Sequence, residues 1–146
     1  MQLIKDASAE KLRGAYYTPP AIASFILHWG INGGQDADIL EPSCGDGVFL
    51  ECMRDENMLF NTVTAIEYEA AEANKARTLG LHDSEVINQD FHRFCLDTDK
   101  RFDLVVGNPP FIRYQYYDPA QQKLADEIFS NAKLKRTKLT NAWVTF

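Results

Sequence analysis

The chain has 146 residues, 45% of them hydrophobic and 25% charged. This length and composition fit one globular domain with a real core, without repeats or low-complexity stretches and without an apolar run long enough to cross a membrane. A net charge of −6 argues against a strong grip on nucleic acid within these residues, because contacts to phosphate dominate that affinity.

The N-terminal third predicts an arm and one clear helix. Residues 1–13 carry helix formers without a strong apolar face, so we expect an arm or a short helix there. Thr18 is placed to cap a helix that begins at Pro19 and ends at Gly30. The predicted apolar face of this helix consists of Ile22, Phe25, Ile26 and Trp29. The cap does not explain the run Gly14–Tyr17 before it, which contains two tyrosines. These side chains could have a function, or they could simply anchor the loop.

A strand beginning at Ile39 ends in the glycine loop Glu41-Pro42-Ser43-Cys44-Gly45-Asp46-Gly47, and a helix starts at Val48. Strand, glycine loop and helix together let a backbone approach a ligand closely. The loop lacks the third glycine of the dinucleotide pattern and the Lys-Ser/Thr of a phosphate loop. Glu41 would repel a phosphate and suits a ligand with an ammonium or sulfonium group. By itself, the pattern is equally compatible with a tight structural turn.

The next two strands also end in acidic residues. The strand Thr62–Ile66 runs into Glu67, roughly 20 residues after the glycine loop, where a carboxylate can accept hydrogen bonds from ribose hydroxyls. A helix is predicted over Glu69–Leu79, stopped by Gly80. The strand Ser84–Ile87 leads to Asp90-Phe91, an acid beside an aromatic ring that can hold an adenine, although Asp90 can equally serve as a helix cap.

A fourth strand, Leu104–Val106, is predicted to be buried and runs through Gly107 into Asn108-Pro109-Pro110-Phe111. Its exit combines a side-chain amide, a carbonyl held by two prolines and an aromatic face; the alternative is ordinary loop punctuation. Alternating strands and helices predict an α/β fold with a parallel, doubly wound sheet. The first and fourth strands should then be neighbours where the strand order reverses, which is where ligands bind in such sheets.

The C-terminal part should be helical. The run Arg113–Tyr117 could line the mouth of a site or pack a loop. Asp118 is placed to cap a helix running from Pro119 to about Ala132, and Leu139–Phe146 should begin another apolar helix. The only basic cluster lies between them, and such a run is more often a solvated surface than a binding site. It consists of Lys133, Lys135, Arg136 and Lys138.

The cysteines and histidines predict no metal site. Three cysteines, an odd number without metal-ligand spacing, and the lack of a signal-peptide pattern indicate reduced thiols and a cytoplasmic protein. Cys44, without a basic partner nearby in sequence, is more consistent with packing than with a nucleophile. The histidines are not spaced as ligands and are expected on the surface or in helices; they are His28, His82 and His92.

Five stretches in one order carry a resemblance: Gly14-Ala15-Tyr16-Tyr17-Thr18-Pro19, Glu41 to Gly47, Glu67, Asp90-Phe91 and Asn108 to Phe111. They resemble motifs X, I, II, III and IV of the gamma group of N6-adenine DNA methyltransferases of restriction-modification systems. The resemblance implies a Rossmann-like class I S-adenosylmethionine-dependent methyltransferase fold. About four of about seven strands are visible here, so the chain is expected to be the N-terminal part of a catalytic domain. The implied division is an arm (1–13), a cofactor and catalytic-loop part (14–117) and a helical segment (118–146).

The resemblance also implies roles for individual residues. Asn108 and the carbonyl of Pro109 would take the two N–H groups of the target adenine amine, with Pro110 stiffening that backbone and Phe111 stacking on the flipped base. S-adenosylmethionine would contact Thr18 through its methionine end, Glu41 through its ammonium and Glu67 through its ribose. The full set implied for cofactor binding is Tyr17, Thr18, Glu41, Pro42, Cys44, Gly45, Gly47, Glu67, Tyr68, Asp90, Phe91 and Asn108.

The implied substrate is adenine in double-stranded DNA, gripped mainly by a C-terminal recognition domain beyond these residues. The chain alone would then be inactive, and the truncated sheet edge is expected to self-associate. Two alternatives stay open. One is a same-fold glutamine or protein methyltransferase, such as those of release factors, which share the Asn-Pro-Pro-aromatic loop but lack the leading Gly-Ala-Tyr-Tyr-Thr-Pro. The other is a cofactor-binding module without turnover.

Overall fold

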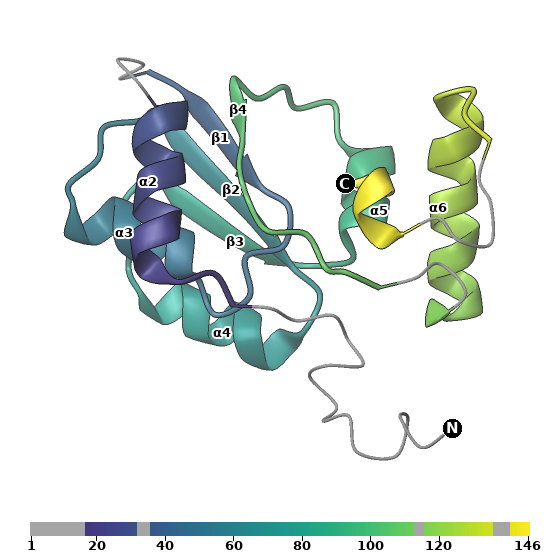
Figure 1. Ribbon diagram of the computed structural model, residues 1–146, viewed down its shortest axis with the longest axis horizontal. Helices are drawn as coiled ribbons and strands as arrows, with labels where there is room; N and C mark the ends of the chain where they lie inside the picture. The colour runs from purple at the N-terminus through teal and green to yellow at the C-terminus, as the bar shows by residue number, and fades with distance from the viewer. Residues whose placement is uncertain (1–16, 32–35, 113–115, 136–140) are drawn as a thin grey trace. The chain divides into compact units, whose positions relative to one another are not determined.

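A computed structural model describes residues 17–31, 36–112, 116–135 and 141–146 (Figure 1). Their contacts divide the chain into two compact units, one spanning Tyr17–Asn108 and one that includes Pro109–Phe146; we call them the sheet unit and the C-terminal unit. The arm predicted over residues 1–13 lies outside the described residues. Within the described ranges, no helix has the length and apolar character needed to span a membrane.

The sheet unit is built on four parallel strands in the order β3-β2-β1-β4. The strands are β1 (Asp38–Glu41), β2 (Thr62–Glu67), β3 (Ser84–Asn88) and β4 (Leu104–Val105). In β1, Glu41 pairs with Ala65 of β2, and Ile39 pairs with Leu104 of β4. The predicted parallel α/β sheet, with the first and fourth strands side by side, is therefore confirmed.

Helices cover both faces of this sheet (Figure 1). They are α2 (Pro20–Gly30), α3 (Val48–Asp55), α4 (Ala70–Thr78) and α5 (Phe91–Asp97). The first three pack on one face, and α5 lies on the other, as right-handed crossovers require. Because side chains alternate along a strand, every second residue of β1 and β2 faces the larger core. This core includes Ala23, Leu27, Ile39, Phe49, Leu50, Met53, Val63 and Ala65.

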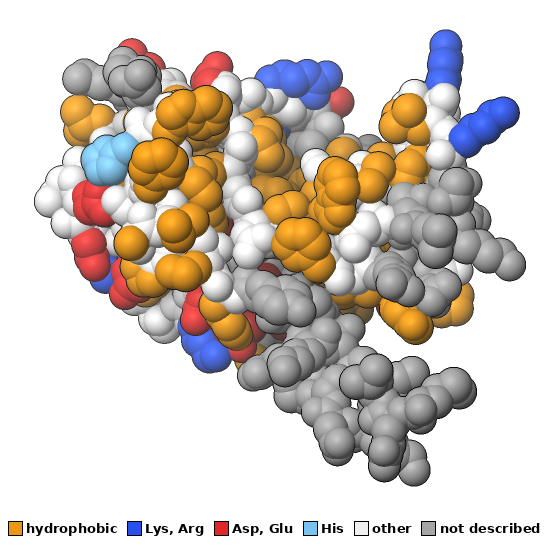
Figure 2. Space-filling model, viewed as in Figure 1, with side chains coloured by type: hydrophobic (Ala, Val, Ile, Leu, Met, Phe, Trp, Pro, Cys, Tyr) orange, Lys and Arg blue, Asp and Glu red, His pale blue; other side chains and the backbone are white. Residues whose placement is uncertain are grey.

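The predicted apolar face of α2 is wrong in part. Ala23 and Leu27 are fully buried and Ile26 is half-buried, whereas the stripe of larger side chains at the same helical spacing faces solvent (Figure 2). That exposed stripe consists of Ile22 at 51%, Phe25 at 70% and Trp29 at 79% exposure. A Cβ on Gly30 would lie 3.1 Å from Leu104 Cδ1, so α2 approaches the sheet through its small residues. Periodicity cannot distinguish between two adjacent apolar stripes.

The start of α2 and the burial of β4 also differ from the prediction. Pro19, not Thr18, is the N-cap residue and Pro20 the first helical residue, without a side-chain capping bond. In β4, Val106 after the strand is buried, but Val105 is 56% exposed and Leu104 half-buried. Among the described strands β4 is an edge, so one side of it meets solvent.

In the C-terminal unit, the helix α6 (Pro119–Asn131) matches the prediction. The Asp118 carboxylate accepts hydrogen bonds from the backbone N–H groups of Ala120 and Gln121, as expected of an N-cap. The apolar helix predicted at the end is wrong in type, because Ala142–Thr145 forms a single 3₁₀ turn, η2. The stretch 136–140, which holds the basic residues Arg136 and Lys138, lies outside the described residues.

The start of α3 generates a stability prediction. Gly47 has φ +101°, and a Cβ there would lie 2.5 Å from Leu79 Cδ1 and 3.2 Å from the Ala76 Cα. Gly45 also has a positive φ, of +56°, but a Cβ there would have no atom within 4 Å. We expect Gly47→Ala to lower the free energy of unfolding by about 2–4 kcal/mol, through strain and overpacking together, and Gly45→Ala by only about 1 kcal/mol. Urea unfolding of the two variants checks this, and equal losses would contradict the packing argument.

Candidate active site at the carboxyl ends of the strands

The polar residues singled out in the sequence gather where the strands end. Because all four strands are parallel, their carboxyl ends share one edge of the sheet. Glu41 ends β1, Glu67 ends β2, Asn88 ends β3, and Asn108 follows β4 by three residues. The fold therefore brings residues that are 67 positions apart in the chain to the same edge.

The glycine loop between β1 and α3 is tied to the end of β2. The N–H of Cys44 donates to the carbonyl of Ile66 at 2.9 Å, and the N–H of Gly45 donates to Glu67 Oε2 at 2.8 Å. Gly47 N–H donates to the carbonyl of Cys44, also at 2.9 Å. These bonds hold the loop in one shape, and the open space beside Gly45 leaves room for an atom of a ligand to approach the backbone.

The Glu67 carboxylate has two backbone partners. Oε2 accepts from Gly45 N–H, and Oε1 accepts from Glu69 N–H at 2.7 Å. Burial raises the pKa of this carboxyl, and the two backbone bonds oppose that shift. The neighbouring Tyr68 side chain is exposed. Glu67 thus already positions the glycine loop, a role that the spacing in the sequence did not reveal.

Glu41 is the most unusual group of the site. Its side chain is 1% exposed, and Oε2 has no hydrogen-bond partner among the described residues. Burial, followed by the nearby Glu67 and Asp46 carboxylates, raises the pKa of Glu41 to about 8. A buried acid without a partner costs stability, so its presence at this edge points to a ligand that supplies the missing contact.

At the end of β3, the helix-cap alternative for Asp90 is confirmed. Asp90 Oδ1 accepts from the N–H of His92 at 2.8 Å and of Arg93 at 3.3 Å, and it lies 3.1 Å from His92 Nδ1. The rings of Phe91 and His92 are buried. Asn88, which the sequence did not single out, donates through Nδ2 to the carbonyls of Glu67 and Tyr68 at 2.8 Å and so joins the ends of β3 and β2.

The end of β4 lies against the glycine loop. Ser43 Oγ donates to the carbonyl of Asn108 at 3.4 Å, and a Cβ on Gly107 would lie 3.3 Å from Pro42 Cδ. The lack of a side chain at Gly107 therefore allows this close approach. In the sequence, only the position of this glycine between a strand and Asn108 pointed to such a role. Cys44 is buried, and burial above all raises the pKa of its thiol, which favours packing over nucleophilic chemistry.

The remaining predicted residues are placed as follows. Thr18 is half-buried and Tyr17 is exposed, while the rest of the Gly14–Tyr17 run lies outside the described residues. In the C-terminal unit, Pro109 and Pro110 are half-buried and Phe111 is 54% exposed.

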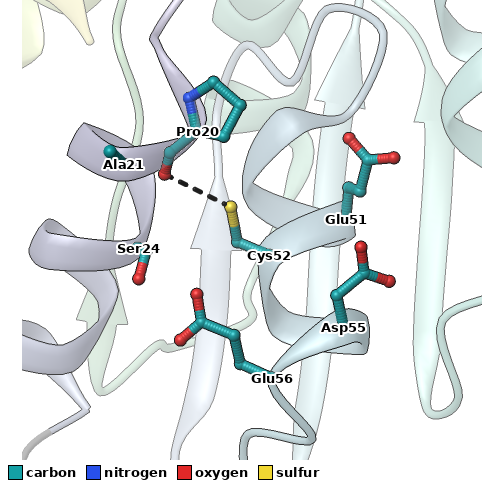
Figure 3. A pocket seen from close by; sticks show the side chains of 7 residues that line it. All are labelled: Pro20, Ala21, Ser24, Glu51, Cys52, Asp55 and Glu56. Atoms are coloured by element: carbon teal, nitrogen blue, oxygen red, sulfur yellow. Dashed lines mark hydrogen bonds between the residues drawn. The ribbon is translucent and has the colours of Figure 1, made fainter.

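A separate pocket lies between α2 and α3 (Figure 3). The thiol of Cys52 donates to the carbonyl of Pro20 at 3.6 Å across it, and His28 Nε2 lies 2.7 Å from Glu56 Oε2 beside it. Three of its lining residues are acidic. The lining residues are Pro20, Ala21, Ser24, Glu51, Cys52, Asp55 and Glu56.

Comparison with known proteins gives consistent matches. A family model described as N-6 DNA Methylase matches residues 2–146. The type II methyltransferase M.CvrRI of Paramecium bursaria Chlorella virus XZ-6E is 32% identical over 121 residues, which are 76% of this chain and 30% of that protein.

Two solved structures share the fold. The methyltransferase subunit of a type I restriction-modification system from Streptococcus thermophilus superimposes with a TM-score of 0.64 at 20% identity, over 91% of this chain and 31% of that one. A Listeria monocytogenes protein described as a class I S-adenosylmethionine-dependent methyltransferase gives 0.61 at 15% identity, over 87% and 38%. The chain thus spans 30% to 38% of the length of these three proteins.

The cap at the start of α5 yields a prediction that separates the capping bonds of Asp90 from its charge. Asp90→Ala removes the acceptor for two backbone N–H groups and should lower the free energy of unfolding by about 1 kcal/mol. Asp90→Asn keeps a capping oxygen and should cost clearly less. Urea unfolding of both variants measures the difference; equal losses would show that the charge of Asp90, not its capping bonds, stabilises the helix.

Proposed function

Because the chain belongs to the N-6 DNA methylase family and has the Rossmann-like fold of class I S-adenosylmethionine-dependent methyltransferases, we propose that its protein methylates the N6 amine of adenine in DNA. The methyl donor would be S-adenosylmethionine, and the substrate a flipped-out adenine at a specific site, as part of a restriction-modification system. The observation that carries this proposal is the closeness of the glycine loop to the end of β4, where a Cβ on Gly107 would lie 3.3 Å from Pro42 Cδ and Ser43 Oγ lies 3.4 Å from the Asn108 carbonyl oxygen. The order of the five sequence motifs supports the gamma group.

The residues at the strand ends fit this cofactor. The unpartnered, buried Oε2 of Glu41 suits a cationic group, and the open space beside Gly45 suits the close approach of a ligand. We assign the ribose to Glu67 with Tyr68, the adenine to Asp90 with Phe91, and the methionine end to Tyr17 and Thr18. Pro42, Cys44 and Gly47 would shape the loop around them. Bound there, S-adenosylmethionine would supply an electrophilic methyl group on a sulfonium.

Asn108 and Pro109 would prepare the acceptor. The exocyclic amine of adenine is a poor nucleophile because its lone pair is delocalised into the ring. Two acceptors, the side-chain oxygen of Asn108 and the carbonyl of Pro109, would hold its two N–H bonds and favour tetrahedral geometry at nitrogen. Pro110 fixes the backbone there, and the exposed ring of Phe111 would stack on the flipped base, offsetting part of a cost of roughly a few kcal/mol.

DNA is the proposed partner, although we expect these residues to make few of the protein's contacts to DNA. The net charge of −6 opposes phosphate binding, and the chain spans 30% of the viral relative. We therefore propose that a part of the protein beyond these residues makes most of the phosphate contacts and that the chain alone is inactive. The three free cysteines support a reducing compartment such as the cytoplasm.

The catalytic assignment is tested by Asn108→Ala. In the full-length protein, with tritiated S-adenosylmethionine and genomic DNA free of N6-methyladenine, we expect a loss of methyl transfer of about 100-fold or more, because one of two acceptors is gone. Ser43→Ala is the matched control: its 3.4 Å contact to the Asn108 carbonyl is long and weak, so only a small loss should follow. Retained activity in Asn108→Ala would overturn the assignment.

The same experiment separates the alternatives. A same-fold protein methyltransferase would label a glutamine-containing protein instead of DNA. A module without turnover would bind S-adenosylmethionine in calorimetry but transfer no methyl group to either substrate. Only the proposed enzyme would both bind S-adenosylmethionine and label adenine in the DNA.

We further propose that the chain self-associates through the edge of β4, where backbone groups beside the exposed Val105 have no neighbouring strand in the described sheet. Val105→Lys should lower the weight-average sedimentation coefficient at high protein concentration, because a charge on an edge strand opposes pairing. Trp29→Lys changes an even more exposed apolar residue, on α2 and not on a sheet edge, and should have no such effect. A chain that stays monomeric at every concentration would contradict the proposal.

A further inference from the structure

Glu41 is enclosed by the sheet and by the glycine loop. It is the last residue of β1, between β2 and β4, and its Cγ lies 3.7 Å from the place where Gly107 would carry a Cβ. Its β2 partner in the register, Ala65, is fully buried. With Oε2 unpartnered among the described residues, nothing there replaces the water that an ionised carboxylate would have in solvent.

The charged groups around Glu41 would not stabilise its ionised carboxylate either. The two that act on it are the carboxylates of Glu67, at the end of β2, and Asp46, in the glycine loop, and both raise its pKa. The Cys44 thiol is the third titratable group of this region, and its pKa is raised as well. The continuation of β4, Gly107-Asn108, contributes no ionisable side chain.

The cations of the helix α4 are engaged with other groups. On α4, Lys75 Nζ lies 2.8 Å from Glu72 Oε1, and Arg77 donates to the carbonyl of Val86 at 2.9 Å and 3.0 Å. On the other face of the sheet, Asp90 is engaged with backbone N–H groups of α5. The favourable state of Glu41 without a ligand is therefore the uncharged acid.

We propose that Glu41 is a proton-exchange site that couples binding of a cationic ligand to release of a proton. Without ligand, the carboxyl carries its proton; when an ammonium or sulfonium lies against Oε2, the O–H bond breaks, the proton passes to a base in solvent, and the carboxylate pairs with the cation. The identity of this ligand as S-adenosylmethionine rests on the proposed function. The exchange makes Glu41 a specificity residue that favours charged over uncharged adenosine compounds.

Release of a proton on binding determines how the affinity for the cofactor changes with pH. Below the pKa of about 8 for the free protein, each binding event releases about one proton, so affinity for the cofactor rises about tenfold per pH unit. Adenosine, which has neither an ammonium nor a sulfonium group, should bind without this dependence. Working between about pH 6 and 7 keeps the ammonium of the cofactor charged, and Glu41→Gln separates the contribution of Glu41 from that of any other titrating group.

Stability without any ligand gives a second readout. The folded-state pKa lies above the value of 4.5 for an exposed glutamate, so the folded chain binds the extra proton between these two values. The contribution of Glu41 to the free energy of unfolding is therefore largest below pH 4.5. This contribution decreases as the pH rises from 4.5 to about 8. Glu41→Gln is uncharged at every pH and similar in shape, so it should lack this decline.

Isothermal titration calorimetry of S-adenosylmethionine in phosphate and in Tris, whose ionisation enthalpies differ, counts the protons released. We expect about one proton for the chain and none for Glu41→Gln. A carbon-13 NMR titration of the glutamate carboxyl groups, without ligand, should show one midpoint near 8 that is lost in Glu41→Gln and lowered in Asp46→Asn. The Asp46 variant keeps the proposal testable if Glu41→Gln does not fold.

The outcomes are distinguishable. Cofactor binding without proton release overturns the exchange and leaves the proposed function standing. An ordinary titration midpoint for all glutamates also overturns it. If Glu41 titrates near pH 8 but S-adenosylmethionine does not bind, the cofactor assignment falls and the exchange with that ligand falls with it.

Discussion

The site depends on the attachment of the glycine loop to the end of β2. The hydrogen bond from Gly45 N–H to the Glu67 carboxylate, with that from Cys44 N–H to the Ile66 carbonyl, holds a loop that would otherwise be free to vary. Once the loop is held, it closes over Glu41 and sets the starting direction of α3. The same loop then meets the end of β4 through Ser43 and Pro42. A contact between β1 and β2 thus positions a residue that follows β4.

This arrangement concentrates negative charge at one edge of the sheet. Glu41, Glu67 and Asp46 lie close enough for the latter two to raise the pKa of the first. In a site selected only for stability, an apolar side chain at position 41 would avoid holding a carboxyl group that is either protonated and unpartnered or ionised beside two other carboxylates. Such unfavourable groups persist where binding uses them, and a cationic ligand is the partner that would relieve both costs together.

The sequence predicted the strands, their order and the glycine loop because each depends on local chemistry: apolar runs, a turn that needs glycine, and short crossovers that admit one handedness. Its prediction for the face of α2 was wrong in part because Ala23 and Leu27 form a second apolar stripe, and only the packing partner decides between the two. The exposure of Val105 depends on its being at an edge, which is a property of the whole sheet. The cap at Asp90 was open between two roles, and the structure establishes one of them without testing the other.

The hydrogen bonds of the loop explain why Gly45-Asp46-Gly47 differs from a loop that binds phosphate. In phosphate-binding loops, successive backbone N–H groups point at the anion. Here the N–H groups of Cys44, Gly45 and Gly47 already donate to the Ile66 carbonyl, the Glu67 carboxylate and the Cys44 carbonyl. Three of the loop's donors are therefore engaged in holding the loop, and the buried side-chain atom without a partner among the described residues, Glu41 Oε2, belongs to an acid. We therefore infer that the glycines of this strand-to-helix turn would give a ligand room, and that the buried acid at the end of β1 would favour a cationic one.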